Sequence, residues 1–517
     1  MKHIKFLIIP AILALTGCSF DFSIHFPEIS IGGSSYSYSA GSAAQYSQEG
    51  AVSKVEVKDK LSMRQIAANT GMDYLPNEGE VNLLVLPIEL QGYPFSSYFR
   101  TDLEHALNGT AEDTGYWESL SSFYEKTSFG KVHLHFEIAD TYVSELSPRS
   151  ALTSYKTGEG SDNGGYFVES ALDAYNAKHD TLKFDSDNNG WIDGIVAVYS
   201  CPDFQKMTAG FDDDGYFWAY TYWLVDDPVV GAPTGNLYFW LSYDFIYEAV
   251  RTPRVDAHTL IHETGHMFGL DDYYPSSDAE FDPVGGLDMM SHNILDHDCY
   301  SKMALGWVDP YVVTGEAEIT LNPSNVNGDC ILVPALDKDG NVVYNGSAFD
   351  EYMLVEFYTP DGLNAMDARN RYPGRTLGYT QPGVKIFHVD ARVMRFNADR
   401  SGRKINQTYV ENIAEIPSDR RNYYEVGATN CSKEVACADS SFSLIHLMEA
   451  GGWNTFASGS LADNGTLFKR GDSFSMARYG MNFFPKKSVF NSGANFPYTI
   501  TVKELSTTSA TISITKA

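Results

Sequence analysis

The stretch HTLIHETGHMFGLDDYY, from His258 to Tyr274, decides how the rest of this sequence is interpreted. Within it, His262 and His266 are four residues apart, so on a helix their side chains lie on the same face. Glu263 completes the pattern His-Glu-x-x-His. Two imidazoles on one helical face beside a carboxylate form the core of a zinc-hydrolase site. Gly269 is expected to end this helix and let the chain turn.

The turn after the helix brings a third candidate ligand, Asp272, round to the two histidines. Neutral His262 and His266 and the Asp272 carboxylate are predicted to bind Zn²⁺, with a fourth position left open for water. Zinc would lower the pKa of that water towards about 7, and Glu263 would take its proton as general base. His258, one turn before His262, is expected to play a supporting role, since three protein ligands suffice for a catalytic site.

The stretch HETGHMFGLDD resembles the metzincin zinc-binding pattern, in the variant that has aspartate as third ligand. The resemblance implies that Gly285–Ser291 (GGLDMMS) forms the Met-turn beneath the metal, with Met290 favoured over Met289. His292 stands two residues after Met290, where some metzincins have a tyrosine that stabilises the oxyanion. A histidine can donate that hydrogen bond. A histidine in a surface loop is the alternative interpretation.

More narrowly, the chain resembles the immune-inhibitor-A family of secreted bacterial metallopeptidases over roughly residues 80–395. Besides the metal helix and the Asp-rich loop, the matching segments are Ser122–Lys131 (SFYEKTSFGK), Lys302–Val308 (KMALGWV), Glu351–Glu356 (EYMLVE) and Gly383–Asp390 (GVKIFHVD). The resemblance implies a metzincin-like catalytic domain, zinc and often calcium. The family usually has a longer pro-region than this chain, which leaves the mechanism of latency open.

The Asp-rich loop, Asp185–Asp193 (DSDNNGWID), reproduces the first nine positions of an EF-hand calcium loop. The candidate calcium ligands are Asp185, Asp187, Asn189, the Trp191 carbonyl and Asp193. Position twelve is Val196 instead of the usual bidentate glutamate, so any missing ligands have to come from elsewhere in the fold. The alternative is an Asp/Asn/Gly turn before a strand at Ile195–Tyr199.

The N-terminus has the features of an export signal. Lys2 and Lys5 precede a short apolar run that ends in Leu-Thr-Gly-Cys at Cys18. A basic start before a short apolar run is typical of a secretory signal rather than a transmembrane helix. Because the ending resembles a bacterial lipobox, we expect an exported lipoprotein that is anchored through Cys18 at the cell surface or outer membrane. Such a protein can also be shed from the membrane. A chance cysteine in an ordinary signal peptide is the alternative.

The sequence predicts an α+β metzincin-like zinc peptidase domain followed by an all-β, sandwich-like C-terminal domain. The expected parts are a signal peptide (1–18), a flexible tether (19–50), a short pro-like segment (51–78), the peptidase domain (79–310) and the β-rich domain (311–517), with a polar insertion near 398–438. Expected elements include strands at 81–88, 132–138 and 195–199, helices at 115–129 and 165–178, and two aromatic strands within 216–247. Thr252 and Pro253 are expected to open the metal helix.

Composition excludes some partners. The 517 residues carry a formal net charge of −30, which argues against binding to nucleic acid or to an anionic membrane surface. Cys431 and Cys437 are close enough in sequence to form a small disulfide loop, whereas the pairing of Cys201, Cys299 and Cys330 cannot be deduced. We expect a monomer whose partners are protein or peptide substrates.

The leading hypothesis is therefore a lipid-anchored zinc endopeptidase that hydrolyses extracellular proteins, with Glu263 as general base. One alternative is a non-catalytic surface adhesion lipoprotein with a relic metal site, although such a site needs no general base. Another is a metallohydrolase that acts on a different amide. Neither the substrate protein nor the cleavage preference can be deduced from the sequence.

Overall fold

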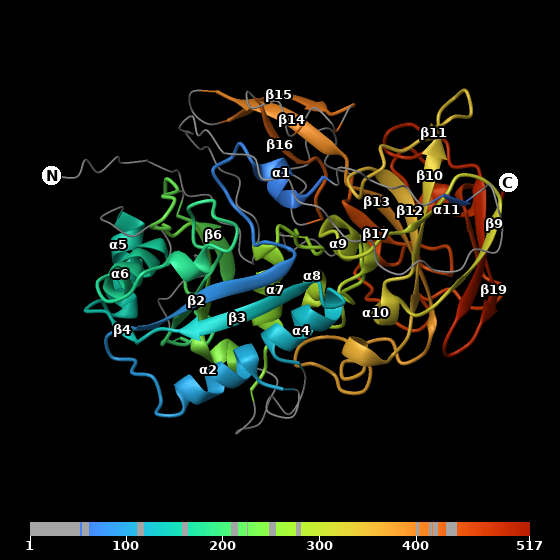
Figure 1. Cartoon of the computed structure of the whole chain (residues 1–517). Helices are drawn as coiled ribbons and strands as arrows, with labels where there is room; N and C mark the ends of the chain where they lie inside the picture. The colour runs from blue at the N-terminus through green and yellow to red at the C-terminus, as the bar shows by residue number, and fades with distance from the viewer. Residues whose placement is uncertain are drawn as a thin grey trace.

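A computed structural model of the chain describes residues 52–53, 61–110, 118–157, 164–207, 216–224, 226–247, 255–275, 281–399, 403–411, 413, 416, 422–430 and 442–516. The predicted signal peptide, tether and Cys18 lie outside these residues, as do Cys431 and Cys437. The described chain is a mixed α/β structure with several sheets (Figure 1). Helices surround the sheet of the N-terminal half, and strands dominate the C-terminal half.

The N-terminal sheet has the strand order β3-β2-β5-β7-β6. Its strands are β2 (Gly79–Glu89), β3 (Val132–Ile138), β5 (Ile195–Tyr199), β6 (Tyr220–Trp223) and β7 (Leu237–Ser242), with β4 (Tyr142–Val143) beside β2. All neighbours are parallel except β6, which runs antiparallel at the edge. The predicted strands at 132–138 and 195–199 are confirmed with the same bounds, and the aromatic stretch provides β6 and β7 as expected.

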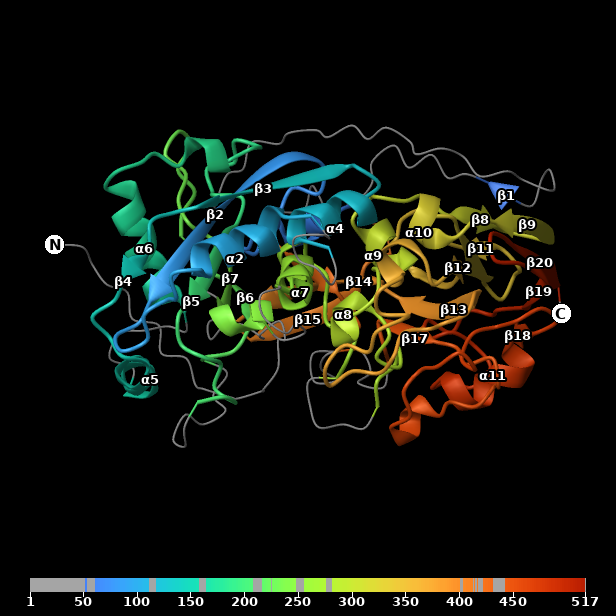
Figure 2. The ribbon, with the colours of Figure 1, turned by 90° about the horizontal axis from the view of Figure 1, so that it is seen from below.

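Both faces of this sheet are covered, as is usual for parallel sheets. Leu83 and Val85 of β2 point into a core shared with α2 (Phe99–Asn108), α4 (Leu120–Thr127) and α7 (His258–Met267). Leu84 and Leu86 point into a second core. That core is shared with α5 (Pro148–Thr157) and α6 (Gly165–Asn176), on the opposite face (Figure 2). The alternation of buried residues along β2 therefore fixes α7 on one side of the sheet.

The C-terminal half contains two sheets that enclose a separate core. The larger sheet comprises β1 (Val52–Ser53), β8 (Tyr311–Val313), β10 (Cys330–Leu336), β12 (Glu351–Tyr358), β13 (Gly383–Asp390) and β17 (Ile445–Leu447), with β11 (Val342–Val343) beside β10. The smaller sheet comprises β9 (Ala317–Leu321), β18 (Ser473–Ser475), β19 (Tyr498–Leu505) and β20 (Ala510–Lys516), and α11 (Met476–Phe483) packs beside it. Strands dominate this half, as predicted, but the presence of α11 means that it is not all-β.

The two halves also share one hydrophobic core. Leu354 of β12 and Phe387 of β13 belong to the same buried cluster as Leu260 of α7. Two short helices, α8 (Met289–His292) and α9 (Cys299–Ala304), precede the C-terminal half in the chain. A third, α10 (Ser324–Asn327), lies between β9 and β10. The architecture thus changes from α/β to mainly β near residue 310, but the two halves remain packed against each other.

The predicted insertion near 398–438 contains strands. They form a three-stranded sheet of β14 (Val393–Ala398), β15 (Lys404–Tyr409) and β16 (Tyr423–Val426). This sheet lies beside α1 (Met63–Ala67), at the top of Figure 1. Among the described residues, no helix is long and apolar enough to span a membrane.

Candidate metal centre

Helix α7 carries both histidines of the predicted zinc site. It begins at His258 after Ala257, whereas Thr252 and Pro253, expected to open it, lie outside the described residues. It ends at Met267, close to the predicted end, and Gly269 then takes a φ of +94°. That backbone conformation is rare for residues with a side chain and reverses the chain. Asp272 is thereby returned to the histidines.

Three ligand atoms of the predicted site meet at one point. The Nε2 atoms of His262 and His266 lie 3.2 Å apart, and Asp272 Oδ1 lies 3.2 Å from each. Tetrahedral ligands about 2.0–2.1 Å from zinc are separated by roughly 3.3 Å. The triangle therefore has the size that three ligands of one zinc ion require.

Backbone carbonyls set the orientation of both rings. Nδ1 of His262 lies 2.9 Å from the Met289 carbonyl oxygen, and Nδ1 of His266 lies 2.8 Å from the Leu270 carbonyl oxygen. Because a carbonyl accepts only, each Nδ1 must be the protonated nitrogen. The lone pair of each neutral ring then sits on Nε2, at the shared point. The rings are held in the tautomer that binds a metal.

The third ligand strengthens the case for a cation. Both carboxylate oxygens of Asp272 are buried and have no well-formed hydrogen bond. Burial opposes ionisation of Asp272, but the charges and contacts of His266 and His262 outweigh it and lower the pKa. Burial likewise opposes the charge of His266, yet Asp272 and Glu263 raise the pKa of that ring to about 10. The centre thus attracts positive charge strongly, as a metal site does.

Glu263 is buried beside the two ligands, with 2% of its surface exposed. The Thr221 hydroxyl, from the edge strand β6, lies 3.2 Å from a carboxylate oxygen of Glu263 and 2.9 Å from its backbone oxygen. Burial raises the pKa of Glu263 above its ordinary value, although His266 and His262 oppose the shift. A raised pKa favours a carboxylate that must take up and return a proton near neutral pH. The sequence did not indicate Thr221.

The two methionines of the predicted Met-turn have different positions. The Met290 sulfur packs against Gly265 of α7, where an added Cβ would lie only 2.4 Å from it. Met289 instead supplies the carbonyl oxygen that orients His262. Met290 is therefore the side chain beneath the metal helix, and Gly265 is the residue that lets it approach.

Two further polar side chains lie near the centre, Tyr274 and His292. The Tyr274 ring stacks on His262, with centroids 6.3 Å apart and planes at 22°. The predicted oxyanion candidate His292 packs against Gly286, and its Nε2 faces Asp282 at 3.5 Å. Sequence reasoning assigned no role to Tyr274, although it lies only two residues after Asp272 and its proximity could have been inferred.

His258 is separated from the metal ligands by a network of its own. Its Nδ1 contacts Asp256, and its Nε2 lies 3.5 Å from Asp367 Oδ1. The Tyr372 hydroxyl donates to the other oxygen of Asp256 at 2.8 Å, and its ring packs on His258. Burial opposes charge on His258, but the two aspartates raise its pKa to about 9. His258 therefore fixes the start of α7, consistent with the supporting role expected for it.

The Asp-rich loop brings three of its predicted ligands together: carboxylate oxygens of Asp185, Asp187 and Asp193 lie within 4.8 Å of one another. Asn189 is arranged differently, because its side-chain oxygen accepts a hydrogen bond from the Trp191 amide at 2.8 Å. Its amide nitrogen donates to Asp73 at 2.6 Å.

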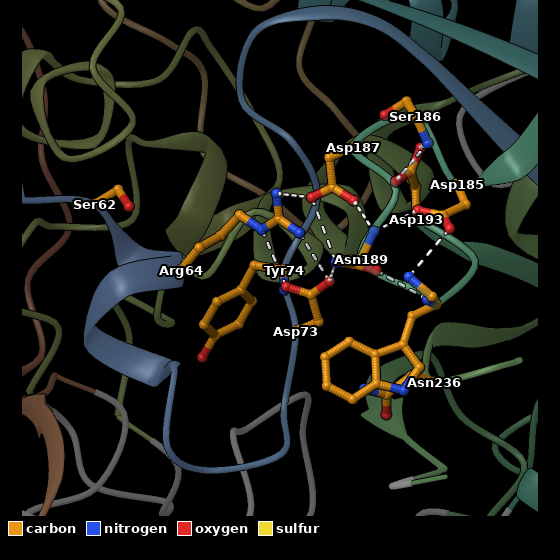
Figure 3. Close-up of polar contacts among 12 residues, drawn as sticks. Ser62, Arg64, Asp73, Tyr74, Asp185, Ser186, Asp187, Asn189, Asp193 and Asn236 are labelled. Carbon is orange, nitrogen blue, oxygen red and sulfur yellow. Dashed lines mark hydrogen bonds and ion pairs between the residues drawn. The ribbon is translucent and has the colours of Figure 1, made fainter. Parts of the chain in front are cut away.

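The pro-like segment contributes an arginine to this loop. Arg64 forms a two-pronged ion pair with Asp73, at 3.0 and 2.8 Å, and contacts Asp187 at 2.6 Å (Figure 3). The segment then runs past the end of α7, where the Leu75 amide donates to the Met267 carbonyl at 2.8 Å. Leu75 itself is buried. From residue 61 onward, the segment therefore packs against the rest of the folded chain.

Three cysteines lie within the described residues. Cys201, Cys299 and Cys330 are all buried as free thiols. Comparison with known proteins adds no assignment, because no protein-family model and no curated protein matches the chain.

Proposed function

We propose that the protein is a zinc-dependent endopeptidase of the metzincin type, similar to the immune-inhibitor-A metallopeptidases. The observation that carries the proposal is the triangle of His262, His266 and Asp272, with edges of 3.2 Å, beside the buried carboxylate of Glu263. A site that only binds a metal needs no buried acid next to its ligands. The packing of Met290 under α7 agrees with the Met-turn that the resemblance implies.

His262, His266 and Asp272 would hold the zinc ion in this mechanism. When bound, zinc would act as a Lewis acid that polarises the scissile carbonyl and makes water more acidic. Glu263 takes a proton from the attacking water and then delivers it to the leaving amine. The Thr221 hydroxyl holds the Glu263 carboxylate in place. Tyr274, whose ring stacks on His262, joins His292 as a candidate to donate a hydrogen bond to the developing oxyanion.

The remaining expectations belong to the same proposal. The substrates are proteins or peptides outside the cell, and the chain is anchored through lipidated Cys18. Calcium binds at Asp185, Asp187 and Asp193, whose carboxylates come close enough for one ion. The chain acts as a monomer and does not bind nucleic acid.

The decisive experiment replaces Glu263 by glutamine. Loss of the general base is expected to lower kcat by about 10²–10⁴-fold, because proton transfer is removed while the ligands stay. Peptide hydrolysis is measured on a mixed protein digest, and zinc content is measured by metal analysis. Zinc content and the unfolding midpoint should match those of the native protein.

A matched control is Glu504→Gln, which removes a carboxylate from an exposed ion pair with Arg470. It should retain full activity. A chelator that removes zinc should abolish hydrolysis in both the native protein and this control. Full activity in zinc-loaded Glu263→Gln, or hydrolysis that survives loss of zinc, would disprove the proposal.

A further inference from the structure

Cys299 and Cys330 come from different halves of the molecule but lie in one buried cluster. Cys299 is the first residue of α9, before the change of architecture near residue 310, and Cys330 is the first residue of β10. Both are free thiols in the structure, and both belong to the core that the two halves share. Cys201 belongs to the separate core on the opposite face of the N-terminal sheet, so it is not a partner for either of them.

The side chain of Glu356 connects the two cysteines. Cys330 is directly opposite Glu356 in the antiparallel pairing of β10 with β12, so the two side chains project from the same face of the sheet. The Cys299 amide donates a hydrogen bond to a carboxylate oxygen of Glu356 at 2.8 Å. The start of α9 therefore lies over the sheet at the position of Cys330.

The Cys330 sulfur contacts the face of α9 that carries Cys299. Its Sγ atom lies 3.9 Å from the sulfur of Met303. Met303 is four residues after Cys299, so these two side chains lie on the same face of the helix. A hydrogen bond with the Cys330 thiol, together with burial, raises the pKa of the Cys299 thiol well above its usual range, which agrees with this arrangement. The two thiols thus lie against each other between α9 and β10.

The remaining cysteines leave these two thiols as a pair. Cys18 is expected to carry the lipid, and Cys431 and Cys437 are expected to close a local loop. Two neighbouring thiols in a reducing compartment would serve only as small apolar side chains. In an oxidising compartment outside the cytoplasm, disulfides form and persist. The location of the protein therefore decides the chemical state of this pair.

We infer that Cys299 and Cys330 form a disulfide in the exported protein, which joins the two halves of the molecule covalently through α9 and β10. The inference rests on the exported location proposed above and not on peptidase activity. It also assigns the pairing that the sequence left open, with Cys201 remaining a single thiol.

The bond forms by exchange with an external disulfide, such as that of a thiol–disulfide oxidoreductase. One cysteine thiolate attacks the external disulfide and releases one thiol, and the second thiolate attacks the resulting mixed disulfide and releases the other. The electron pair and the two protons of the cysteines thus leave on two thiols. Because neither side chain is exposed once the chain is folded, the exchange precedes the packing of α9 on the sheet.

The first measurement is made on the full chain recovered from the membrane fraction. Free thiols are alkylated in denaturant without reductant, and the digested protein is analysed by mass spectrometry. We expect a linked pair of peptides that contain Cys299 and Cys330 and that separate only after reduction. Cys201 should be alkylated before reduction, since no second cysteine shares its core among the described residues.

Alanine substitutions measure what the bridge contributes to stability. Cys299→Ala and Cys330→Ala should each lower the unfolding midpoint by roughly 5–10 °C, because a disulfide restricts the unfolded chain. The double variant should unfold close to the midpoint of either single variant, since one lost thiol already removes the bridge. Cys201→Ala is the matched control, because it removes an equally buried thiol but no bridge, and its midpoint should fall less.

Reduction provides a second readout that does not depend on cavities left by alanine. Dithiothreitol in the unfolding assay should lower the midpoint of the native protein and of Cys201→Ala. It should change the midpoint of Cys330→Ala much less, because the bridge is already absent. An equal effect of dithiothreitol on the native protein and on Cys330→Ala would overturn the inference.

Two results of the alkylation experiment would also overturn it. One is complete alkylation of Cys299 and Cys330 before reduction in the membrane-bound chain. The other is a link from either of them to a different cysteine. A chain found only in the cytoplasm, with both thiols reduced, would refute the proposed location together with the disulfide, so the two kinds of failure are distinguishable.

Discussion

Asp272 and Asp193 are both buried carboxylates in clusters able to hold a metal ion, yet their pKa values shift in opposite directions. Asp272 faces two imidazoles, whose charges outweigh burial and lower its pKa. Asp193 lies among other carboxylates, and burial raises its pKa to about 7, although the Ser186 side chain and amide oppose the shift. One cluster is thus built to keep its aspartate ionised, and the other tends to protonate it.

The surroundings explain the contrast. At the metal centre, carbonyl groups orient the rings, and the oxygens of Asp272 have no well-formed hydrogen bond. In the Asp-rich loop, backbone amides donate hydrogen bonds to the carboxylate of Asp185, and Arg64 neutralises Asp187. The chain thus offsets part of the negative charge in both clusters, through His262 and His266 in the first and through Arg64 in the second.

The largest effect is expected from Asp272→Asn. An amide oxygen is a weaker ligand than a carboxylate and carries no charge. Loss of a residue that only supports a ligand lowers metal affinity by about 10–100-fold, and loss of the ligand Asp272 should lower zinc affinity by more. Competition with a chromogenic chelator measures the dissociation constant. Asp271→Asn is the matched control, because Asp271 is the adjacent carboxylate but contacts Thr429 instead of the histidines. Equal zinc affinity in the two variants would show that Asp272 is not a ligand.

A smaller effect is expected from the pH dependence of Asp193. Its pKa in the folded protein lies above the ordinary value, so the folded state binds the proton more tightly than the unfolded chain does. In calcium-free buffer, stability should therefore decrease as pH rises from about 4 to about 7, by on the order of 3 kcal/mol. Thermal unfolding across this range measures the slope.

Two comparisons isolate the contribution of Asp193. Asp193→Asn should make the slope shallower, because an amide does not titrate in this range, and the remaining slope comes from other buried aspartates such as Asp271 and Asp282. Calcium should also flatten it, since a bound cation favours the ionised carboxylate. A slope that is the same in all three conditions would mean that the loop carries no uncompensated charge.

Much of the fold and of the metal centre could be predicted from local sequence. Alternating and continuous apolar runs predicted β3, β5 and the β-rich character of the C-terminal half, because these strands bury their side chains in one or two cores. The spacing from His262 to Asp272 also predicted three side chains that the structure brings together. Helical periodicity and one glycine turn are sufficient for that result.

Long-range contacts could not be foreseen. Nothing near Arg64 in the sequence indicates that it pairs with Asp187, and nothing near Tyr372 indicates that it packs on His258. These contacts depend on how distant segments pack, which local propensity does not determine. The contact of Asn189 with Asp73, at 2.6 Å, is another that the loop sequence alone does not indicate.

The smallest effect is expected from Arg64→Gln, which tests how far the chain neutralises its own Asp-rich loop. The substitution leaves Asp73 and Asp187 without their cation, but the ion pair is partly exposed, with 19% of the arginine side chain accessible. We therefore expect a loss of about 1 kcal/mol in calcium-free buffer. Calcium should restore part of it, and zinc content should not change. Arg403→Gln, which breaks an exposed pair with Asp399, should cost less, and a larger calcium-independent loss in Arg64→Gln would mean that Arg64 acts through packing alone.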